Sequence, residues 1–311
     1  MTSIPSKAVQ GYPKRRSRLL REIPLHLYLL PGVILLILFA YIPMMGLVIA
    51  FQNFTVFKGW FAADFVGMKN FLYVMKLPNF WNVVNNTIVI SLWKIVLNML
   101  VPIVVALLLN ELRGVRYKRV LQTAMYLPYF LSWVIFGGVI SDMLASEGVV
   151  NHLLQQMNLS PVNFMTNSNN FQSMLVVTEI WKNFGFNTII YMAALTAIDP
   201  THYEAAMIDG ANRWQQTLHV TLPGMLSVIV MLGTLSLGNV LNAGFEQVLV
   251  LYNNLVLDKA DIIDTFVYRL GLEQAKYSVS TAVGLFKSIV SFFLITASYY
   301  LAYRFADYRI F

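Results

Sequence analysis

Six long apolar runs constrain the fold of this chain more than any other feature of its sequence. They lie near residues 27–51, 87–109, 120–142, 173–196, 223–243 and 281–303. The hydrocarbon core of a bilayer is about 30 Å thick and needs about 20 apolar residues per crossing helix. Backbone groups in lipid must be hydrogen-bonded within their own segment, and the alternating pattern of a membrane barrel is absent. We therefore expect an all-α polytopic membrane protein with six transmembrane helices.

The composition agrees with a membrane protein. Hydrophobic residues make up 58% of the chain and charged residues 12%, whereas soluble domains carry about 25% charged residues. The first run is too long and begins too far from the N-terminus to be a cleaved signal peptide. The chain has no Cys, which excludes disulfides, thiol catalysis and Cys metal sites.

The distribution of basic residues predicts the orientation. Outside the runs, thirteen Lys and Arg lie in the two termini and in loops 110–119 and 197–222, against six in loops 52–86, 143–172 and 244–280. The thirteen are Lys7, Lys14, Arg15, Arg16, Arg18, Arg21, Arg113, Arg116, Lys118, Arg119, Arg213, Arg304 and Arg309. Positive residues favour the cytoplasmic side of a membrane. Both termini are thus expected in the cytoplasm, and the net charge of +7 is a topology signal rather than a nucleic-acid surface.

The runs and loops divide the chain into four parts. We expect a cytoplasmic basic tail at 1–26, followed at 27–86 by the first transmembrane helix and an extracytoplasmic segment rich in aromatic residues. Aromatic side chains suit a membrane interface. A core of five further helices occupies 87–303, and a cytoplasmic tail occupies 304–311.

A polar module, residues 199–223, separates the fourth run from the fifth. Asp199 and Pro200 are typical of a helix start, where Asp caps and Pro is tolerated, and Gly210 fits a helix end. The module is therefore expected to form two short helices with an elbow at Gly210. An apolar stripe recurs at helical spacing through both halves and is expected to pack on the transmembrane core. It comprises Tyr203, Met207, Ala211, Trp214 and Leu218.

An amphipathic linker lying on the membrane would show the same periodicity. The residue types are more specific than the periodicity. The module reads Glu204-Ala205-Ala206, then Asp209-Gly210-Ala211, then nine residues from Ala211 to His219, then Val220-x-Leu222-Pro223. This pattern resembles the EAA loop of ABC importer permeases. "YIPMMGLVIAFQNF", "GMKNF", "GFEQVLVLYN", "DIIDTFVYRLGL" and "YSVSTAVGLF" resemble its carbohydrate branch, particularly permeases for oligosaccharides released from polysaccharides.

The resemblance covers about residues 25–305 and implies a type I ABC importer transmembrane domain. In that family the EAA loop is the coupling helix, which docks on an ATPase subunit, with Glu204 and Ile208 here facing out toward the cytoplasm. Carried over by position, the coupling residues are Glu204, Ala205, Asp209, Gly210, Leu222 and Pro223. The implied partners are a second homologous permease, two ATP-binding cassette ATPases and an external solute-binding protein. The residues leave open whether the two permeases are identical.

The chain has no G-x-x-x-x-G-K-[ST] phosphate loop. We therefore expect it to bind no cofactor and to be no enzyme by itself, with ATP and Mg used by the partner ATPases. Two other classes of function fit poorly. An ion-coupled secondary transporter needs midplane carboxylates, and Glu179 is the one acidic residue well inside a run. An intramembrane enzyme lacks its motifs, since neither H-E-x-x-H nor G-x-S-x-G occurs and no metal site is expected.

Three lysines, Lys94, Lys182 and Lys287, lie within runs that are expected to start outside. Each lies roughly 9–14 Å below the outer end of its helix at a rise of 1.5 Å per residue. A charge there costs about 2.5–3.5 kcal/mol on insertion scales. Either the lysines reach the outer headgroups and Glu179 neutralises Lys182, or they form a basic collar around the path of an acidic, alginate-type oligosaccharide. The family resemblance favours Gln rather than Lys at position 287, which favours the acidic sugar over a neutral one.

Further side chains in the runs could contact a sugar through amides and aromatic faces. They are Trp93, Asn98, Trp181, Asn183, Asn187, Tyr191, Asn239 and Asn242. The alternative is helix–helix packing, in which Asn side chains often bridge membrane helices.

Overall fold

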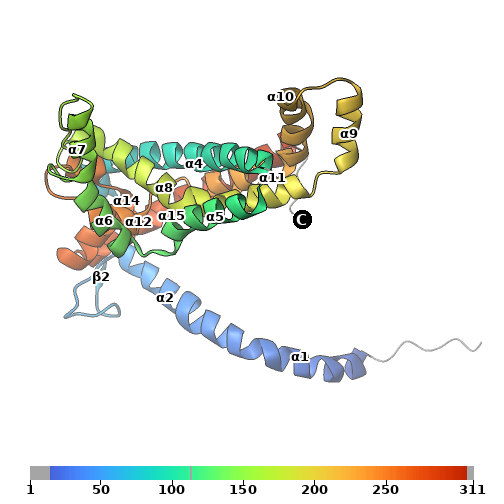
Figure 1. The fold of residues 1–311 in the computed structure, drawn as a ribbon. Coiled ribbons are helices and arrows are strands. Elements are labelled where there is room, and N and C mark those ends of the chain that lie inside the picture. Colours follow the sequence, from blue (N-terminus) through green and yellow to red (C-terminus); the bar gives the residue numbers. More distant parts are fainter. Residues whose placement is uncertain (1–14, 113, 307–311) are drawn as a thin grey trace, which may run out of the picture. The chain divides into compact units, whose positions relative to one another are not determined.

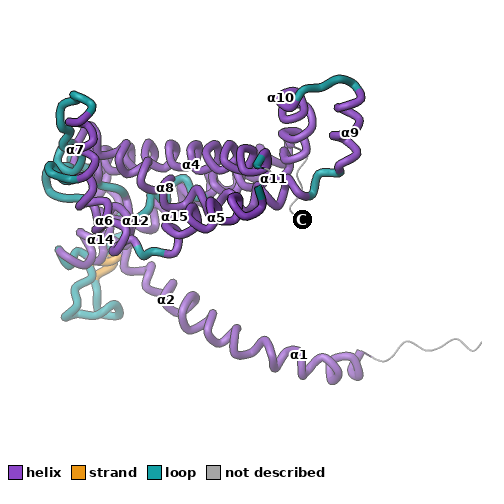
Figure 2. The backbone as a smooth tube through the Cα atoms, viewed as in Figure 1, coloured by secondary structure: helices purple, strands orange, loops and turns teal. Residues whose placement is uncertain are grey.

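The computed structural model describes residues 15–112 and 114–306. The basic residues Lys7, Lys14, Arg113 and Arg309, on which part of the orientation rests, lie outside the described residues. Two compact units divide the chain, one ending at Ile49 and one beginning at Ala50. Helices form most of the described backbone (Figure 1, Figure 2).

The first unit is one long interrupted helix. Its elements are α1 (Arg15–Leu36), the π-helical turn η1 (Ile37–Tyr41), α2 (Ile42–Met44) and most of the 3₁₀ helix η2 (Met45–Phe51), whose last two residues belong to the second unit. Residues His26–Phe51 are apolar enough to cross a membrane, with a mean hydropathy of 2.7. The first predicted helix is thereby confirmed, and the expected tail is helical from Arg15 onward.

The second unit is a helical bundle. Its helices are α3 (Lys69–Met75), α4 (Phe80–Glu111), α5 (Val115–Tyr126), η3 (Leu127–Phe130), α6 (Trp133–Leu144), α7 (Val149–Gln156), α8 (Ser168–Thr196), α9 (Pro200–Ile208), α10 (Arg213–Gln216), η4 (Thr217–Thr221), α11 (Leu222–Gly238), α12 (Phe245–Leu251), α13 (Leu257–Ala260), α14 (Ile263–Tyr268), η5 (Arg269–Glu273) and α15 (Tyr277–Ala306). Two short strands, β1 (Gln52–Asn53) and β2 (Asp64–Phe65), pair antiparallel. Helices α4 and α8 pack along each other at the centre.

The loops gather at the two ends of this bundle as the sequence predicts. Figure 1 shows α9 and α10 at one end and α6, α7, α12 and α14 at the other. The side chain of Arg213 lies 2.7 Å from that of Glu111, which puts loop 110–119 at the end that holds the polar module. The backbone N–H of Phe54 donates to the Ser278 hydroxyl at 2.9 Å, which puts the aromatic segment at the opposite end.

The prediction of one continuous helix at 120–142 is wrong. The chain leaves the helix at η3, Leu131 is extended, and α6 starts anew with Ser132 as its cap. Pro128 in η3 lacks an N–H and so removes one hydrogen bond from an α-helical ladder at this point. The ammonium of Lys182 on α8 donates to three carbonyls at this break, those of Pro128, Tyr129 and Leu131, at 3.2, 2.8 and 2.6 Å. A cation is favourable at such a helix C-terminus.

The other predicted bounds need smaller corrections. Helices α4, α8 and α15 extend beyond the predicted runs 87–109, 173–196 and 281–303, because polar turns continue a helix past its apolar stretch. The run 223–243 is misplaced at both ends. Its helix is continuous from Arg213 and ends at Gly238, five residues early.

Among the described residues, five segments are long and apolar enough to cross a membrane. They are His26–Phe51, Phe80–Glu111, Trp133–Gln156, Arg213–Gly238 and Tyr277–Tyr300. Helix α8 is long enough, with 29 residues, but it carries Glu179, Lys182 and Asn183 and does not belong to this set. A multi-pass helical membrane protein is confirmed, while the sixth crossing stays a prediction.

Gly185 allows α8 to touch the end of α5. A Cβ at this position would lie 2.0 Å from the Met125 carbonyl oxygen, a contact that backbone must move to relieve. We expect Gly185→Ala to destabilise the protein by about 1–3 kcal/mol, the usual cost of overpacking. Thermal unfolding in detergent measures this, with Gly138→Ala as the control because open space surrounds Gly138. Equal melting temperatures for the two variants would contradict the close approach.

Candidate functional site

The first helix of the polar module, α9, starts at the capping residue that the sequence predicts. The Asp199 carboxylate accepts the backbone N–H of Thr201 at 2.9 Å and caps α9, with Pro200 as the first helical residue. This backbone hydrogen bond to the charged form lowers the pKa of Asp199. The predicted start of the first short helix is thus confirmed.

The elbow at Gly210 is also confirmed. Gly210 is left-handed, with φ +78°, which a glycine adopts without strain. The N–H of Ala211 donates to the Ala206 carbonyl at 2.9 Å and closes the end of α9. Asn212 and Gln215 then form a capping box that starts α10. Two helix ends with opposite caps therefore fix the angle of the module.

The prediction that the apolar stripe packs on the transmembrane core is wrong. Met207, Trp214 and Leu218 are 57%, 70% and 41% exposed. The α9 helix stands apart from the bundle end (Figure 1), and it is tied back where the Tyr203 hydroxyl lies 3.0 Å from that of Thr221. Helical spacing predicts that the stripe residues share a face, but it does not say what covers that face.

The module consequently presents a mixed surface. Ile208, 87% exposed, lies on α9 beside the predicted coupling residues. Of these, Glu204, Ala205, Asp209, Gly210 and Pro223 are exposed and Leu222 is half-buried. An acidic and apolar protrusion on a short, capped helical hairpin is suited to docking in a groove of a partner protein.

Lys94 lies inside the bundle. Its ammonium donates to the Ala243 carbonyl at 2.6 Å and to the Gln247 side-chain oxygen, and it lies 3.6 Å from the Glu179 carboxylate. Asn183 donates to the other oxygen of Glu179 at 2.6 Å. Among the described residues, the close ion pair of Glu179 is with Lys94 rather than with Lys182, so Glu179 acts on Lys182 at longer range than expected.

The expected collar of three lysines does not form as predicted. Lys94 and Lys182 are each 6% exposed and end on protein oxygens, so neither reaches for headgroups. Lys182 also lies 5.6 Å from the ring centres of Tyr129 and Trp133. Both lysines stabilise breaks in the helical backbone, and a part for them in sugar passage stays a prediction.

Lys287 differs because it lines an open cavity of 570 Å³, called here the Lys287 pocket. Its ammonium donates to the Asn242 side-chain oxygen at 2.8 Å and to the Asp264 carboxylate at 2.6 Å. Asn242 in turn donates to the Asn239 side-chain oxygen at 3.1 Å, which brings the two predicted asparagines together. The residues that line this pocket are Asn242, Phe245, Asp264, Val267, Tyr268, Gly271, Leu272, Tyr277, Ser280, Thr281 and Lys287.

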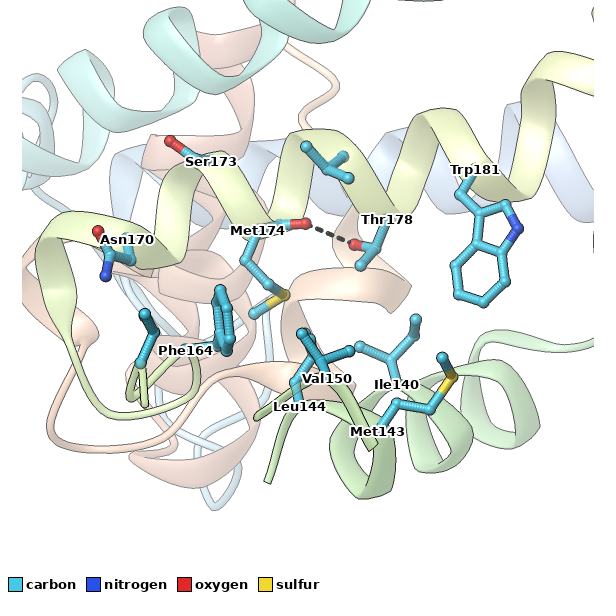
Figure 3. A pocket seen from close by; sticks show the side chains of 12 residues that line it. Ile140, Met143, Leu144, Val150, Phe164, Asn170, Ser173, Met174, Thr178 and Trp181 are labelled. Carbon is cyan, nitrogen blue, oxygen red and sulfur yellow. Dashed lines mark hydrogen bonds between the residues drawn. The ribbon is translucent and has the colours of Figure 1, made fainter. Parts of the chain in front are cut away.

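The other predicted sugar contacts do not join this pocket. Trp181 lies in a 540 Å³ cavity with aliphatic side chains such as Ile140 and Leu144 (Figure 3), which offers a sugar few polar partners. Asn98, Asn187 and Tyr191 share a cavity of 100 Å³, whereas small-molecule sites usually measure about 300–1,000 Å³. Trp93 lines a separate groove between α4 and α8 and is 57% exposed. For these residues the structure favours packing.

The sequence interpretation missed Phe245, Asp264, Tyr268 and Tyr277. Asp264 and Tyr268 are four residues apart, so a helix at 263–268 puts them on one face. The short α14 has no long apolar run to reveal it. A signal was nevertheless present, because the quoted stretch "DIIDTFVYRLGL" contains both residues.

Comparison with known proteins agrees with these features. Residues 98–310 match the family model described as binding-protein-dependent transport system inner membrane component. The polygalacturonan/rhamnogalacturonan transport system permease protein YteP of Bacillus subtilis (strain 168) is 41% identical over 291 residues, 93% of this chain and 91% of that protein.

Two solved structures share the fold. One is a crystal structure of a bacterial ABC transporter involved in the import of the acidic polysaccharide alginate, with a TM-score of 0.86, 34% identity and coverage of 93% of this chain and 98% of that one. The other is a bacterial alginate ABC transporter in complex with an alginate pentasaccharide-bound periplasmic protein, with a TM-score of 0.85, 34% identity and coverage of 93% and 96%. The chain belongs to the family of binding-protein-dependent transport system inner membrane components, as a permease subunit of the carbohydrate ABC importer type.

Proposed function

We propose that this chain carries an acidic, uronate-type oligosaccharide across a bacterial cytoplasmic membrane, after an external solute-binding protein has delivered it. The observation that carries this proposal is the Lys287 ammonium in an open pocket with amide, hydroxyl and aromatic side chains. Charge-assisted hydrogen bonds to a carboxylate are about twice as strong as neutral ones. The names of the relatives, which include transporters for alginate and for polygalacturonan/rhamnogalacturonan, support an acidic substrate.

The proposal includes the rest of the complex. A second permease would complete the path, and two ATPases would bind ATP and Mg and dock on the polar module. Helix α8 would be the sixth crossing, since it packs against α4, α5 and α11 and has 29 residues. Both termini would then lie in the cytoplasm, on the same side as the module.

Lys287→Gln tests the substrate class. We expect uptake of a uronate trisaccharide by the reconstituted transporter to fall about 10- to 100-fold, because one charged hydrogen bond worth about 1.5–3 kcal/mol is lost. Uptake of a neutral trisaccharide should stay the same or rise. Lys276→Gln is the matched control, because Lys276 is exposed near the same end of the bundle and lies outside the pocket. Unchanged uronate uptake in Lys287→Gln would support a neutral sugar instead.

A further inference from the structure

Several separate elements build the Lys287 pocket, and α12 contributes Phe245 at its start. Helix α14 and η5 contribute one helical face, on which Asp264, Tyr268 and Gly271 recur at spacings of four and three. Helix α15 contributes its first turn and Lys287, and the turn between α11 and α12 contributes Asn242. The volume of 570 Å³ lies within the usual range for small-molecule sites, about 300–1,000 Å³.

The ammonium of Lys287 donates fewer hydrogen bonds to the described residues than it can make. A lysine has three N–H donors, and the described residues supply acceptors for two of them, on Asp264 and Asn242. The side chains of Lys287 and Asp264 are 16% and 26% exposed, so water and ligands can reach both. Asp264 therefore holds the cation in place without enclosing it.

We propose that Asp264 pairs with Lys287 in the absence of substrate, and that the carboxylate of a bound uronate residue displaces Asp264 from the Lys287 ammonium. This inference rests on the proposed function and deepens it, because it assigns a specificity-determining residue opposite the lysine. The exchange breaks the hydrogen bond from the Lys287 ammonium to Asp264 and forms one from the same ammonium to the sugar. No covalent bond changes.

The aromatic wall of the pocket supports the placement of a sugar beside this ion pair. The rings of Phe245 and Tyr268 lie 5.8 Å apart and are tilted, and the Tyr268 side chain follows Asp264 by one helical turn. Side chains four residues apart on a helix are about 5–6 Å apart at Cβ. A sugar ring against Tyr268 would thus have its carboxylate within reach of Lys287.

Repulsion makes the exchange selective. Two carboxylates at one site strongly disfavour each other's charged form, so a bound uronate forces the Asp264 side chain to turn away. A neutral sugar brings no such repulsion and leaves the ion pair intact. The two kinds of sugar would leave α14 in different positions, and α14 packs on α15. Asp264 would in this way report the charge of the substrate to a membrane-crossing helix.

Asp264→Asn tests the exchange in the complete reconstituted transporter. We expect half-maximal stimulation of ATP hydrolysis at about tenfold less uronate trisaccharide, delivered by the binding protein, because the competing charge is gone. The concentration of a neutral trisaccharide that gives half-maximal stimulation of ATP hydrolysis should not change. Glu273→Gln is the matched control, since it removes an exposed carboxylate of the same segment that does not line the pocket.

A merely structural role predicts a different result. Asp264→Asn would then lower the melting temperature and change the half-maximal concentrations of the uronate and the neutral trisaccharide together. Asp264→Glu would restore the melting temperature and both concentrations. If Asp264→Asn and Glu273→Gln have the same half-maximal uronate concentration, the exchange is wrong even when both fold. That outcome leaves the proposed function standing, because the Lys287→Gln experiment decides the proposed function independently.

Discussion

Lys94→Met is expected to lower the free energy of unfolding of the purified permease by about 3–5 kcal/mol, the cost of removing one partner of a buried ion pair. The Glu179 carboxylate, 18% exposed, would lose the one cation paired with it among the described residues. The Ala243 carbonyl and the Gln247 side chain would lose their donor as well. Denaturant titration of the detergent-solubilised protein measures the change.

The double variant Lys94→Met/Glu179→Gln separates the cost of the unpaired Glu179 carboxylate from the rest of the stability loss. We expect it to recover part of the lost stability, because the carboxylate that Lys94→Met leaves without its ion pair is also removed. Lys69→Met is the control for loss of a lysine, since Lys69 is exposed at the start of α3. If Lys94→Met is as stable as Lys69→Met, the ion pair with Glu179 does not stabilise the bundle.

Gly210→Pro is expected to reduce binding-protein-stimulated ATP hydrolysis and sugar uptake by about a hundredfold, the loss that a misplacement of about 1 Å can cause. Proline fixes φ near −65°, whereas Gly210 has φ +78° and donates its N–H to the Met207 carbonyl. The elbow between α9 and α10 could not form. The measurements are co-purification with the ATPases, ATP hydrolysis and uptake in proteoliposomes.

Two companion variants make the result specific. Gly210→Asn should keep most of the activity, because Asn tolerates the left-handed conformation. Glu204→Lys should lose coupling while the fold of the hairpin stays intact, because it reverses one exposed charge on α9. Retained ATPase and full uptake in both Gly210→Pro and Glu204→Lys would exclude docking at this module. Uptake that also resisted vanadate would then support an ion-coupled transporter.

The parts of the fold that depend on local physics were predictable from the sequence. A bilayer demands a helix wherever about 20 apolar residues occur in a row, so α4 and α15 were found, and only their polar ends were missed. Asp199 and Gly210 act on their own backbone neighbours, and both roles were predicted. The helix break that follows Pro128 is not predictable from the sequence, because apolar residues continue through the break. The carbonyls at the break are satisfied by Lys182, which lies more than fifty residues away in the chain.

The candidate site was less predictable, for a geometric reason. Helical rise gives the depth of Lys94, Lys182 and Lys287, but not the direction in which each side chain points around its helix. Two of them turned into the protein, toward carbonyls at helix breaks that the sequence did not show. The Lys287 pocket joins Asn242, Asp264 and a residue of α15, which no spacing along the chain relates.

The helical segment from Arg213 to Gly238, which includes the π-helical turn η4, leads from the polar module toward the Lys287 pocket. Its 26 residues make a rod of roughly 39 Å at 1.5 Å per residue. The capped elbow of the polar module is fastened to one end, and Asn242 follows four residues after the other. A tilt of about 5° at the module would carry the far end through roughly 3 Å on a rod of this length. Because Asn242 accepts a hydrogen bond from the Lys287 ammonium at 2.8 Å, a displacement of this size would break that contact and reshape the wall of the Lys287 pocket.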